Sequence, residues 1–257
     1  MSAIIRIEFG KLLHLTSLRF SLVLLALFPI LWAYAPGVFD VYGFFVVSGF
    51  QVPALALLSS MEFLLPLLVA IASAELLGLE IAHGTLPTVL LRPLTRSQWL
   101  LAKLLVVAVY PFVLLGFFLM VGLATGVLFG YGPFVGGTGV GAGGLLGEGV
   151  MAPGAAMVEL VSAYAIAALS LVPIGMLAVL FTVLLMNAAG GALATMATLI
   201  FMQLMVVFPT LEPFLLTSQL SAYVSPVAGL IWVIALIGLY CLAFALMALM
   251  LFERKDF

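Results

Sequence analysis

Charged side chains are scarce in this sequence. Only 7% of its 257 residues are Asp, Glu, Lys or Arg, whereas 66% are hydrophobic. Soluble domains carry roughly 25% charged residues. The deficit excludes a water-soluble globule and predicts that most of the chain lies in lipid. Because the apolar runs are long enough for helices, we expect an all-α integral membrane protein with one transmembrane domain over residues 1–257.

Cysteine and histidine are almost absent, which removes several kinds of chemistry. The single Cys241 excludes an intrachain disulfide framework. The only histidines, His14 and His83, provide no ligand set for a metal and no base for a catalytic triad. We therefore expect neither a metal site nor a catalytic residue. The net charge of −2 provides no basic surface for nucleic acid, so no nucleic-acid partner is expected either.

Phosphate-binding loops are missing too. No Gly-x4-Gly-Lys-Ser/Thr motif occurs anywhere in the chain. Gly139-x-Gly141-x-x-Gly144 has the spacing of a dinucleotide-binding motif, but it follows a membrane span rather than a β-strand. A flexible external loop over 130–154 is the better interpretation. We expect that the chain is not an enzyme and binds no cofactor of its own, so that any ATP-driven step needs a separate chain.

Long apolar runs with few or no charged residues predict six membrane-spanning helices. A helix needs about 20 apolar residues to cross the hydrocarbon core of a bilayer. Charged residues divide the chain into runs that hold one, one, one, two and one such helix. A tight hairpin at 187–191 separates the two helices of the longest run. The predicted spans cover about residues 20–38, 53–76, 102–129, 158–186, 190–208 and 227–251, and short external helices are expected within 208–226.

Basic residues predict the orientation of these spans. Lys and Arg occur only within 6–19, 92–103 and 254–255. Such residues gather on the cytosolic side, so two and then four spans separate the three groups, and both termini are cytosolic. The hairpin near 187 should also be cytosolic, although it carries no Lys or Arg.

The N-terminal stretch, about 4–19, predicts an interfacial helix that lies along the membrane surface. A positive flank that only orients the first span would explain the same residues equally well. In the helical interpretation, one apolar face is formed by Ile5, Phe9, Leu12, Leu13, Thr16 and Phe20.

The connection between the second and third spans carries strong local signals. Thr95 and Gln98 have the spacing of a capping box, which predicts that a helix begins there and runs into the third span. Upstream, Gly84 permits a sharp turn, Thr85 can cap a short helix, and Pro93 ends it. A connection with this much local definition favours docking to a soluble partner.

The same connection resembles the cytosolic segment of type-2 ABC transporter permeases. The resemblance lies in Glu80-x3-Gly84-Thr85-Leu86, followed by Leu90-Leu91-x-Pro93-Leu94-Thr95-Arg96 and then Lys103. It implies a coupling helix that sits in a cleft of a separate ATP-hydrolysing subunit, where ATP and Mg would bind. Pro87 departs from the family pattern, in which Glu is common. The residues to which the resemblance assigns ATPase coupling are Glu80, Gly84, Thr85, Leu86, Arg92, Pro93 and Arg96.

The resemblance implies that the chain is the permease subunit of an ATP-driven exporter. Six spans form half of a pathway, so a second permease copy or a related permease would pair with it. Two ATPase subunits would bind the cytosolic face, and membrane lipid would surround the complex. The implied location is the plasma membrane of a bacterium or archaeon. The few charges in the spans favour an amphipathic or lipid-like substrate, whose identity the sequence leaves open.

Acidic residues at membrane depth are candidates for a substrate path. Such residues are costly in lipid and usually face a cavity or a partner. Glu62 lies inside the second predicted span, Glu159 lies near the start of the fourth, and Gln203 is a further polar candidate. The alternative is that these acids lie near the outer interface and only help the spans to pack.

Two other functions stay open at this point. An ion-coupled secondary transporter would show an internal repeat, and none is clear in this sequence. A non-transporting membrane subunit of a larger assembly would have the same bundle of spans but no ATPase partner.

Overall fold

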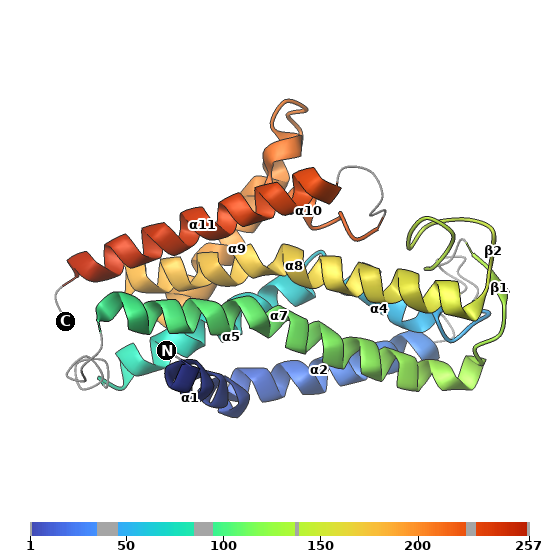
Figure 1. The fold of residues 1–257 in the computed structure, drawn as a ribbon, viewed down its shortest axis with the longest axis horizontal. Coiled ribbons are helices and arrows are strands. Elements are labelled where there is room, and N and C mark those ends of the chain that lie inside the picture. The colour runs from blue at the N-terminus through green and yellow to red at the C-terminus, as the bar shows by residue number, and fades with distance from the viewer. Residues whose placement is uncertain (1, 35–45, 85–94, 137–138, 225–229, 256–257) are drawn as a thin grey trace.

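A computed structural model describes residues 2–34, 46–84, 95–136, 139–224 and 230–255. Six of its helices are long and apolar enough to cross a membrane, as predicted for an all-α membrane protein (Figure 1). They are α2 (Thr16–Tyr34), α5 (Leu64–Ala82), α7 (Arg96–Gly126) with the 3₁₀ turn η1 (Val127–Phe129), α8 (Pro153–Leu185), α9 (Ala188–Met205) and α11 (Leu230–Arg254).

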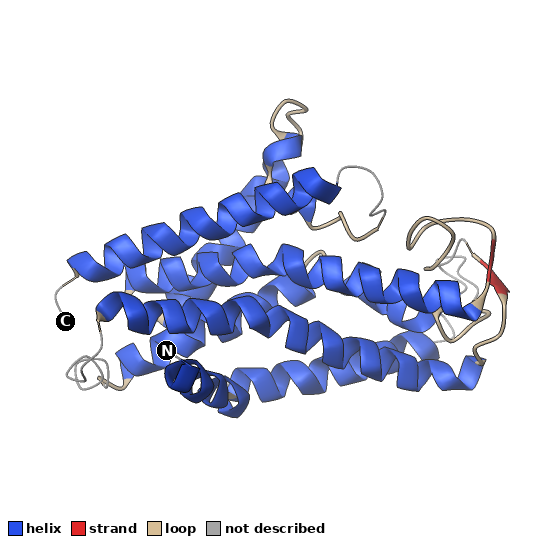
Figure 2. Ribbon diagram, viewed as in Figure 1, coloured by secondary structure: helices blue, strands red, loops and turns tan. Residues whose placement is uncertain are grey.

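Shorter elements complete the described fold, which Figure 2 shows to be almost entirely helical. They are α1 (Ser2–His14), α4 (Gln51–Ser60), α10 (Leu216–Gln219), the 3₁₀ turn η2 (Glu212–Phe214) and two short strands, β1 (Phe134–Val135) and β2 (Val150–Met151). The elements η2 and α10 are the short helices that the sequence predicts within 208–226.

Helix α8 forms the centre of the bundle. It packs against α5, α7, α9 and α11. In the most apolar 18-residue stretch of α8, 72% of the residues are buried within the chain, compared with 22% in the corresponding stretch of α11. Helix α11 therefore leaves most of its apolar surface to lipid or to another membrane chain, whereas α8 is enclosed by its neighbours.

The second predicted span, 53–76, is wrong as a single helix, because the chain divides into α4 and α5 at residues 61–63. Pro66 provides the physical reason. In a continuous helix the N–H of residue 66 would donate to the carbonyl of Glu62, but proline has no N–H and its ring clashes with that carbonyl. Helix α5 instead begins at Leu64, which places Pro66 in the first turn, where a missing N–H is harmless.

The N-terminal stretch 4–19 is also not one helix, because α1 ends at His14 and α2 begins at Thr16. In Figure 1, α1 is seen nearly end-on, across the direction of the long helices. The predicted apolar face is wrong as a face of one helix, because Thr16 and Phe20 belong to α2 whereas Ile5, Phe9, Leu12 and Leu13 belong to α1. Each helix has its own buried face: Glu8 and Leu12 are buried on α1 and Leu18 on α2, and Leu15 is buried at the turn between them.

The glycine-rich residues 130–154 contain more structure than the predicted flexible loop. Strands β1 and β2 pair antiparallel, with Phe134 opposite Met151. Val140 and Leu145 are fully buried, and the Leu145 N–H donates to the Val224 carbonyl at 2.9 Å. These apolar anchors hold the segment against the bundle. Its Gly-x-Gly-x-x-Gly spacing serves tight turns, with Gly141 bridged to Gly144.

The hairpin between α8 and α9 is tighter than the sequence predicts. Only Met186, at φ 54°, and Asn187 connect the two helices, and the glycines at 190 and 191 lie inside α9. The Asn187 side chain accepts hydrogen bonds from the backbone N–H of Ala189 at 2.9 Å and of Gly190 at 3.3 Å. Asn187 therefore acts as the N-cap of α9.

Gly78 of α5 packs closely against this hairpin. A Cβ atom at Gly78 would lie 2.3 Å from the Cβ of Ala188 and 2.8 Å from its Cα, whereas Gly116 of α7 has open space around it. Alanine stabilises a helix by roughly 0.5–1 kcal/mol over glycine, but overpacking costs about 1–3 kcal/mol. We expect Gly78→Ala to lower the thermal unfolding temperature in detergent and Gly116→Ala not to. Equal behaviour of the two variants would contradict this close packing.

Candidate functional site

The described basic residues belong to α1, to the first two turns or so of α2 and α7, and to the C-terminal end of α11, and these parts lie at one end of the bundle together with the α8–α9 hairpin (Figure 1). We call it the basic end, and it is the end that the sequence predicts to be cytosolic. The hairpin carries no Lys or Arg of its own, but Lys255 lies against it. The Lys255 Nζ donates to the carbonyls of Val183 at 2.7 Å and Leu184 at 2.8 Å, close to the C-terminus of α8. A cation is favourable there because the last carbonyls of a helix lack partners within the helix.

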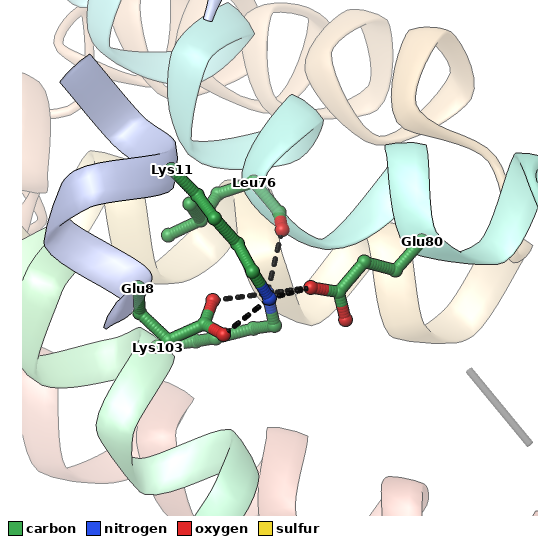
Figure 3. Close-up of polar contacts among 5 residues, drawn as sticks. All are labelled: Glu8, Lys11, Leu76, Glu80 and Lys103. Atoms are coloured by element: carbon green, nitrogen blue, oxygen red, sulfur yellow. Dashed lines mark hydrogen bonds and ion pairs between the residues drawn. The ribbon is translucent and has the colours of Figure 1, made fainter. Parts of the chain in front are cut away.

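A cluster of four charged residues joins α1, α5 and α7 at the basic end (Figure 3). Lys103 of α7 is fully buried, and its three N–H groups have three acceptors. Its Nζ lies 2.6 Å from Glu8 Oε2, 2.7 Å from the Leu76 carbonyl oxygen and 3.1 Å from Glu80 Oε1. Lys11 of α1 completes the cluster, with its Nζ 2.6 Å from Glu8 Oε1 and 2.6 Å from Glu80 Oε1.

Helical spacing explains why these groups meet. Residues three or four apart share one face of a helix. Glu8 and Lys11 therefore point together from α1, and the Leu76 carbonyl and Glu80 lie one turn apart on α5. The charge cluster, which we define as Glu8, Lys11, Glu80 and Lys103, has two positive and two negative charges.

Burial makes the balance of charge in this cluster important. An unpaired buried charge is strongly unfavourable, whereas a paired and hydrogen-bonded charge is tolerated. Half-exposed Lys11 shows the effect of its partners. Its partial burial lowers the pKa, but hydrogen bonds and charge attraction from Glu8 and Glu80 outweigh this, so the pKa of Lys11 is raised above its ordinary value. The cluster therefore holds Lys11 in its charged form.

A second set of contacts joins α7 to α11 beside the charge cluster. Trp99 is 2% exposed, and its ring stacks on Phe252 at 5.4 Å between centroids. The Lys103 Nζ lies 4.7 Å from the Trp99 ring centroid, a cation–π distance. At the start of α7, Arg96 Nη1 donates to the Lys255 carbonyl at 2.8 Å. The basic end thus connects α1, α5, α7, α8 and α11 in one network.

These contacts hold both ends of the predicted coupling segment. Glu80 belongs to the charge cluster, and Gly84 adopts φ +62°, a conformation that favours glycine. Arg96 is the first residue of α7, directly after its capping box: the Gln98 N–H donates to Thr95 Oγ1 at 3.2 Å, and the Thr95 N–H donates to Gln98 Oε1 at 3.4 Å. The predicted capping box is therefore confirmed. The remaining predicted coupling residues, Thr85, Leu86, Arg92 and Pro93, lie outside the described residues.

A cavity of about 600 Å³ lies at the break between α4 and α5. Helix α9 and the chain around α10 form its other walls. Gln203 lines it at a position roughly 24 Å along α9 from Asn187, at 1.5 Å per residue. Because the hydrocarbon core is about 30 Å thick, the cavity lies toward the membrane face opposite the basic end. Its polar lining consists of Glu62, Gln203, Glu212, Thr217, Ser218, Ser221 and Tyr223.

The structure brings together two of the three predicted path residues. Glu62 and Gln203 both line the cavity, although they are far apart in sequence. Glu159 is half-buried near the start of α8 and is not among the lining residues. Sequence reasoning missed Glu212 and Thr217 in the cavity, and Glu8 and Lys11 in the charge cluster. The i, i+3 spacing of Glu8 and Lys11 was the available signal, but their partners lie on other helices.

The model for the ABC-2 family transporter protein matches residues 4–184 of this chain. The chain belongs to the ABC-2 transporter family. The matched residues include the whole charge cluster and Glu62. Helices α9, α10 and α11, and with them Gln203, lie after the last matched residue. No curated protein matches the chain.

Membership in the ABC-2 family indicates what kind of subunit this chain is. With six helices that can cross a membrane, it is a multi-pass membrane permease of an ABC transporter. Members of this family work with an ABC ATPase, and the ATPase activity lies in that partner subunit. The absence of a phosphate-binding loop from the sequence agrees with this division of roles.

Proposed function

We propose that this permease couples ATP hydrolysis in its partner to export of an amphipathic or lipid-like substrate across the plasma membrane. The observation that carries the proposal is the charge cluster, which links both sides of the segment 80–96 to α1, α5 and α7. A push on this segment would move three helices together, because breaking a buried, hydrogen-bonded ion pair costs several kcal/mol.

In this proposal the coupling residues are Glu80, Gly84, Thr85, Leu86, Arg92, Pro93 and Arg96. Two copies of the ATPase bind the basic end, which faces the cytosol, and ATP and Mg bind only in those copies. A second permease copy or a related permease completes the pathway, which Glu62 and Gln203 line. Glu159 lies outside the cavity and would contact the substrate only along another part of the path.

The first test is purification of the chain from its native membrane in a mild detergent. We expect a soluble ATPase to co-purify in a stoichiometric amount. If the chain comes out alone in several detergents, with nucleotide present, the coupling proposal fails. An ion-coupled secondary transporter or a non-transporting membrane subunit would then explain the bundle better.

Charge reversal within the segment tests where the ATPase docks. We expect Arg92→Glu combined with Arg96→Glu to weaken ATPase association at least tenfold, about 1.4 kcal/mol, while membrane insertion stays intact. The matched control is Arg6→Glu combined with Arg254→Glu, because both residues are exposed at the basic end but outside the segment. Association is measured by co-purification at several salt concentrations. Equal association of the two double variants would remove the arginines from the docking surface.

The two arginines must also be separated, because Arg96 donates to the Lys255 carbonyl within this chain. A loss of association in Arg96→Glu alone, together with a lower unfolding temperature, indicates that the helix start was disturbed. A loss in Arg92→Glu alone, with an unchanged unfolding temperature, indicates a direct contact with the ATPase.

A further inference from the structure

The last residues of the described chain contact two other long helices at the basic end. The Ser97 hydroxyl, in the first turn of α7, donates to the Glu253 carboxylate near the end of α11. Lys255 follows directly after α11 and contacts α7 and α8 with different groups. Its backbone carbonyl accepts from Arg96 Nη1 at 2.8 Å, and its Nζ donates to two backbone carbonyls in the last turn of α8. Lys255 therefore joins the start of α7 to the end of α8.

Helix α11 depends on these contacts for its position at the basic end. Among the described residues, every hydrogen bond that joins α11 and Lys255 to another of the six long helices is made by Glu253 or Lys255. Association of helices in lipid has no hydrophobic driving force, because lipid tails are as apolar as the side chains. These directional contacts and the stack of Trp99 on Phe252 therefore decide where the end of α11 lies relative to α7 and α8.

The end of α8 is closely packed against the beginning of α9. A Cβ atom at Gly191 of α9 would lie 2.2 Å from Thr182 Oγ1 of α8, and only two residues connect the two helices. The end of α8 therefore has little space to move without α9. Helix α9 in turn forms one wall of the cavity at the α4–α5 break, to which Gln203 contributes. A displacement of the end of α8 thus reaches the wall of that cavity.

We propose that Ser97, Glu253 and Lys255, which we call the C-terminal bridge, are positioning residues for coupling. They carry a displacement of the start of α7 to α8, and through α9 to the cavity wall. The inference rests on the proposed coupling function, in which the partner ATPase acts on the segment that ends at Arg96. The charge cluster connects that segment to α1 and α5, whereas the bridge connects it to α8 and α11. Two of the three bridge residues lie after the family match, which ends at residue 184.

The test uses the complex of this chain with its co-purified ATPase in lipid nanodiscs. The only cysteine is removed by Cys241→Ala, and an environment-sensitive fluorophore is attached at Leu204→Cys, an exposed position on α9 that does not line the cavity. We expect ATP and Mg to shift the emission of this label. We expect Lys255→Met and Ser97→Ala each to reduce the shift at least fivefold, while the ATPase still co-purifies.

Matched variants separate the bridge from general effects of charge and stability. Arg254→Met removes the exposed basic residue next to Lys255 and should leave the emission shift unchanged. Lys255→Arg keeps a donor and Glu253→Gln keeps an acceptor, so we expect both to retain the shift. Thermal unfolding is measured for every variant, and the shifts are compared at equal folded fraction. A loss of the shift in the conservative and non-conservative variants alike would overturn the proposal.

Failure of the bridge and failure of the coupling proposal give different results. A shift that survives in both Lys255→Met and Ser97→Ala would reject the bridge and keep the coupling proposal. Equal losses in Lys255→Met and Arg254→Met would also reject the bridge, because only one of these residues contacts α8. If an ATPase co-purifies but the chain without bridge substitutions shows no shift, transmission to α9 is rejected. If no ATPase co-purifies, the coupling proposal fails and the bridge fails with it.

Discussion

Replacing Lys103 with methionine is expected to lower the free energy of unfolding by about 3–5 kcal/mol, the usual cost of removing one partner from a buried ion pair. The Lys103 side chain is fully buried, and the Glu8 side chain next to it is only 3% exposed. Methionine has a similar length but no charge. The variant leaves two carboxylates with Lys11 as the only cation of the cluster. Unfolding of the purified chain, followed by circular dichroism in one detergent, measures the loss.

A second substitution distinguishes charge imbalance from poor packing. Glu8→Gln combined with Lys103→Met restores equal numbers of positive and negative charges, so we expect the double variant to be more stable than Lys103→Met alone. Arg19→Met serves as the control, because Arg19 is an exposed basic residue at the same end. The interpretation is wrong if Lys103→Met costs no more than Arg19→Met, which should change stability by less than about 0.5 kcal/mol.

Replacing Trp99 with alanine is expected to cost about 3 kcal/mol, the lower end of the range for buried aromatic residues. The lower end applies because a separated membrane helix still has lipid around its apolar side chains, so the loss is mainly one of packing. The change removes both the stack on Phe252 and the ring below Lys103. It therefore weakens the packing of α11 against α7 at the basic end, where the hydrogen bond from Arg96 to the Lys255 carbonyl remains.

Trp232 provides a matched control on α11. It is 51% exposed, so Trp232→Ala removes the same side chain from a position with fewer packing neighbours. We expect Trp99→Ala to lower the unfolding temperature by several degrees more than Trp232→Ala does. Protease accessibility of the C-terminus should rise in Trp99→Ala only. Equal effects in the two variants would show that the Trp99–Phe252 stack does not hold the helices together.

Local signals in the sequence predicted local structure well. The capping box at Thr95 and Gln98 depends on residues three apart, so its geometry follows from the chain itself. The six spans follow from apolar length, because a helix in lipid must satisfy its own backbone hydrogen bonds. Pro66 was also visible in the sequence. Its missing N–H explains why one helix ends before it and another begins there.

The candidate sites were predicted less completely because their parts come from distant segments. Glu62 and Gln203 were both named, but the sequence could not show that they share a cavity with Glu212 and Thr217. Glu80 was assigned to the coupling segment, but nothing near it in the sequence indicated Lys11 as its partner.

By itself, the sequence determined that this chain is a six-span helical membrane protein with a defined connection between its second and third spans. Apolar run lengths, capping residues and the arrangement of basic residues are sufficient for that, because each acts over a few helical turns. Only the tertiary structure decided that Lys103 pairs with Glu8, 95 positions away, and that Lys255 lies against the carbonyls of α8. Charges in a low-dielectric interior need partners, and helix packing determines which partners come within reach.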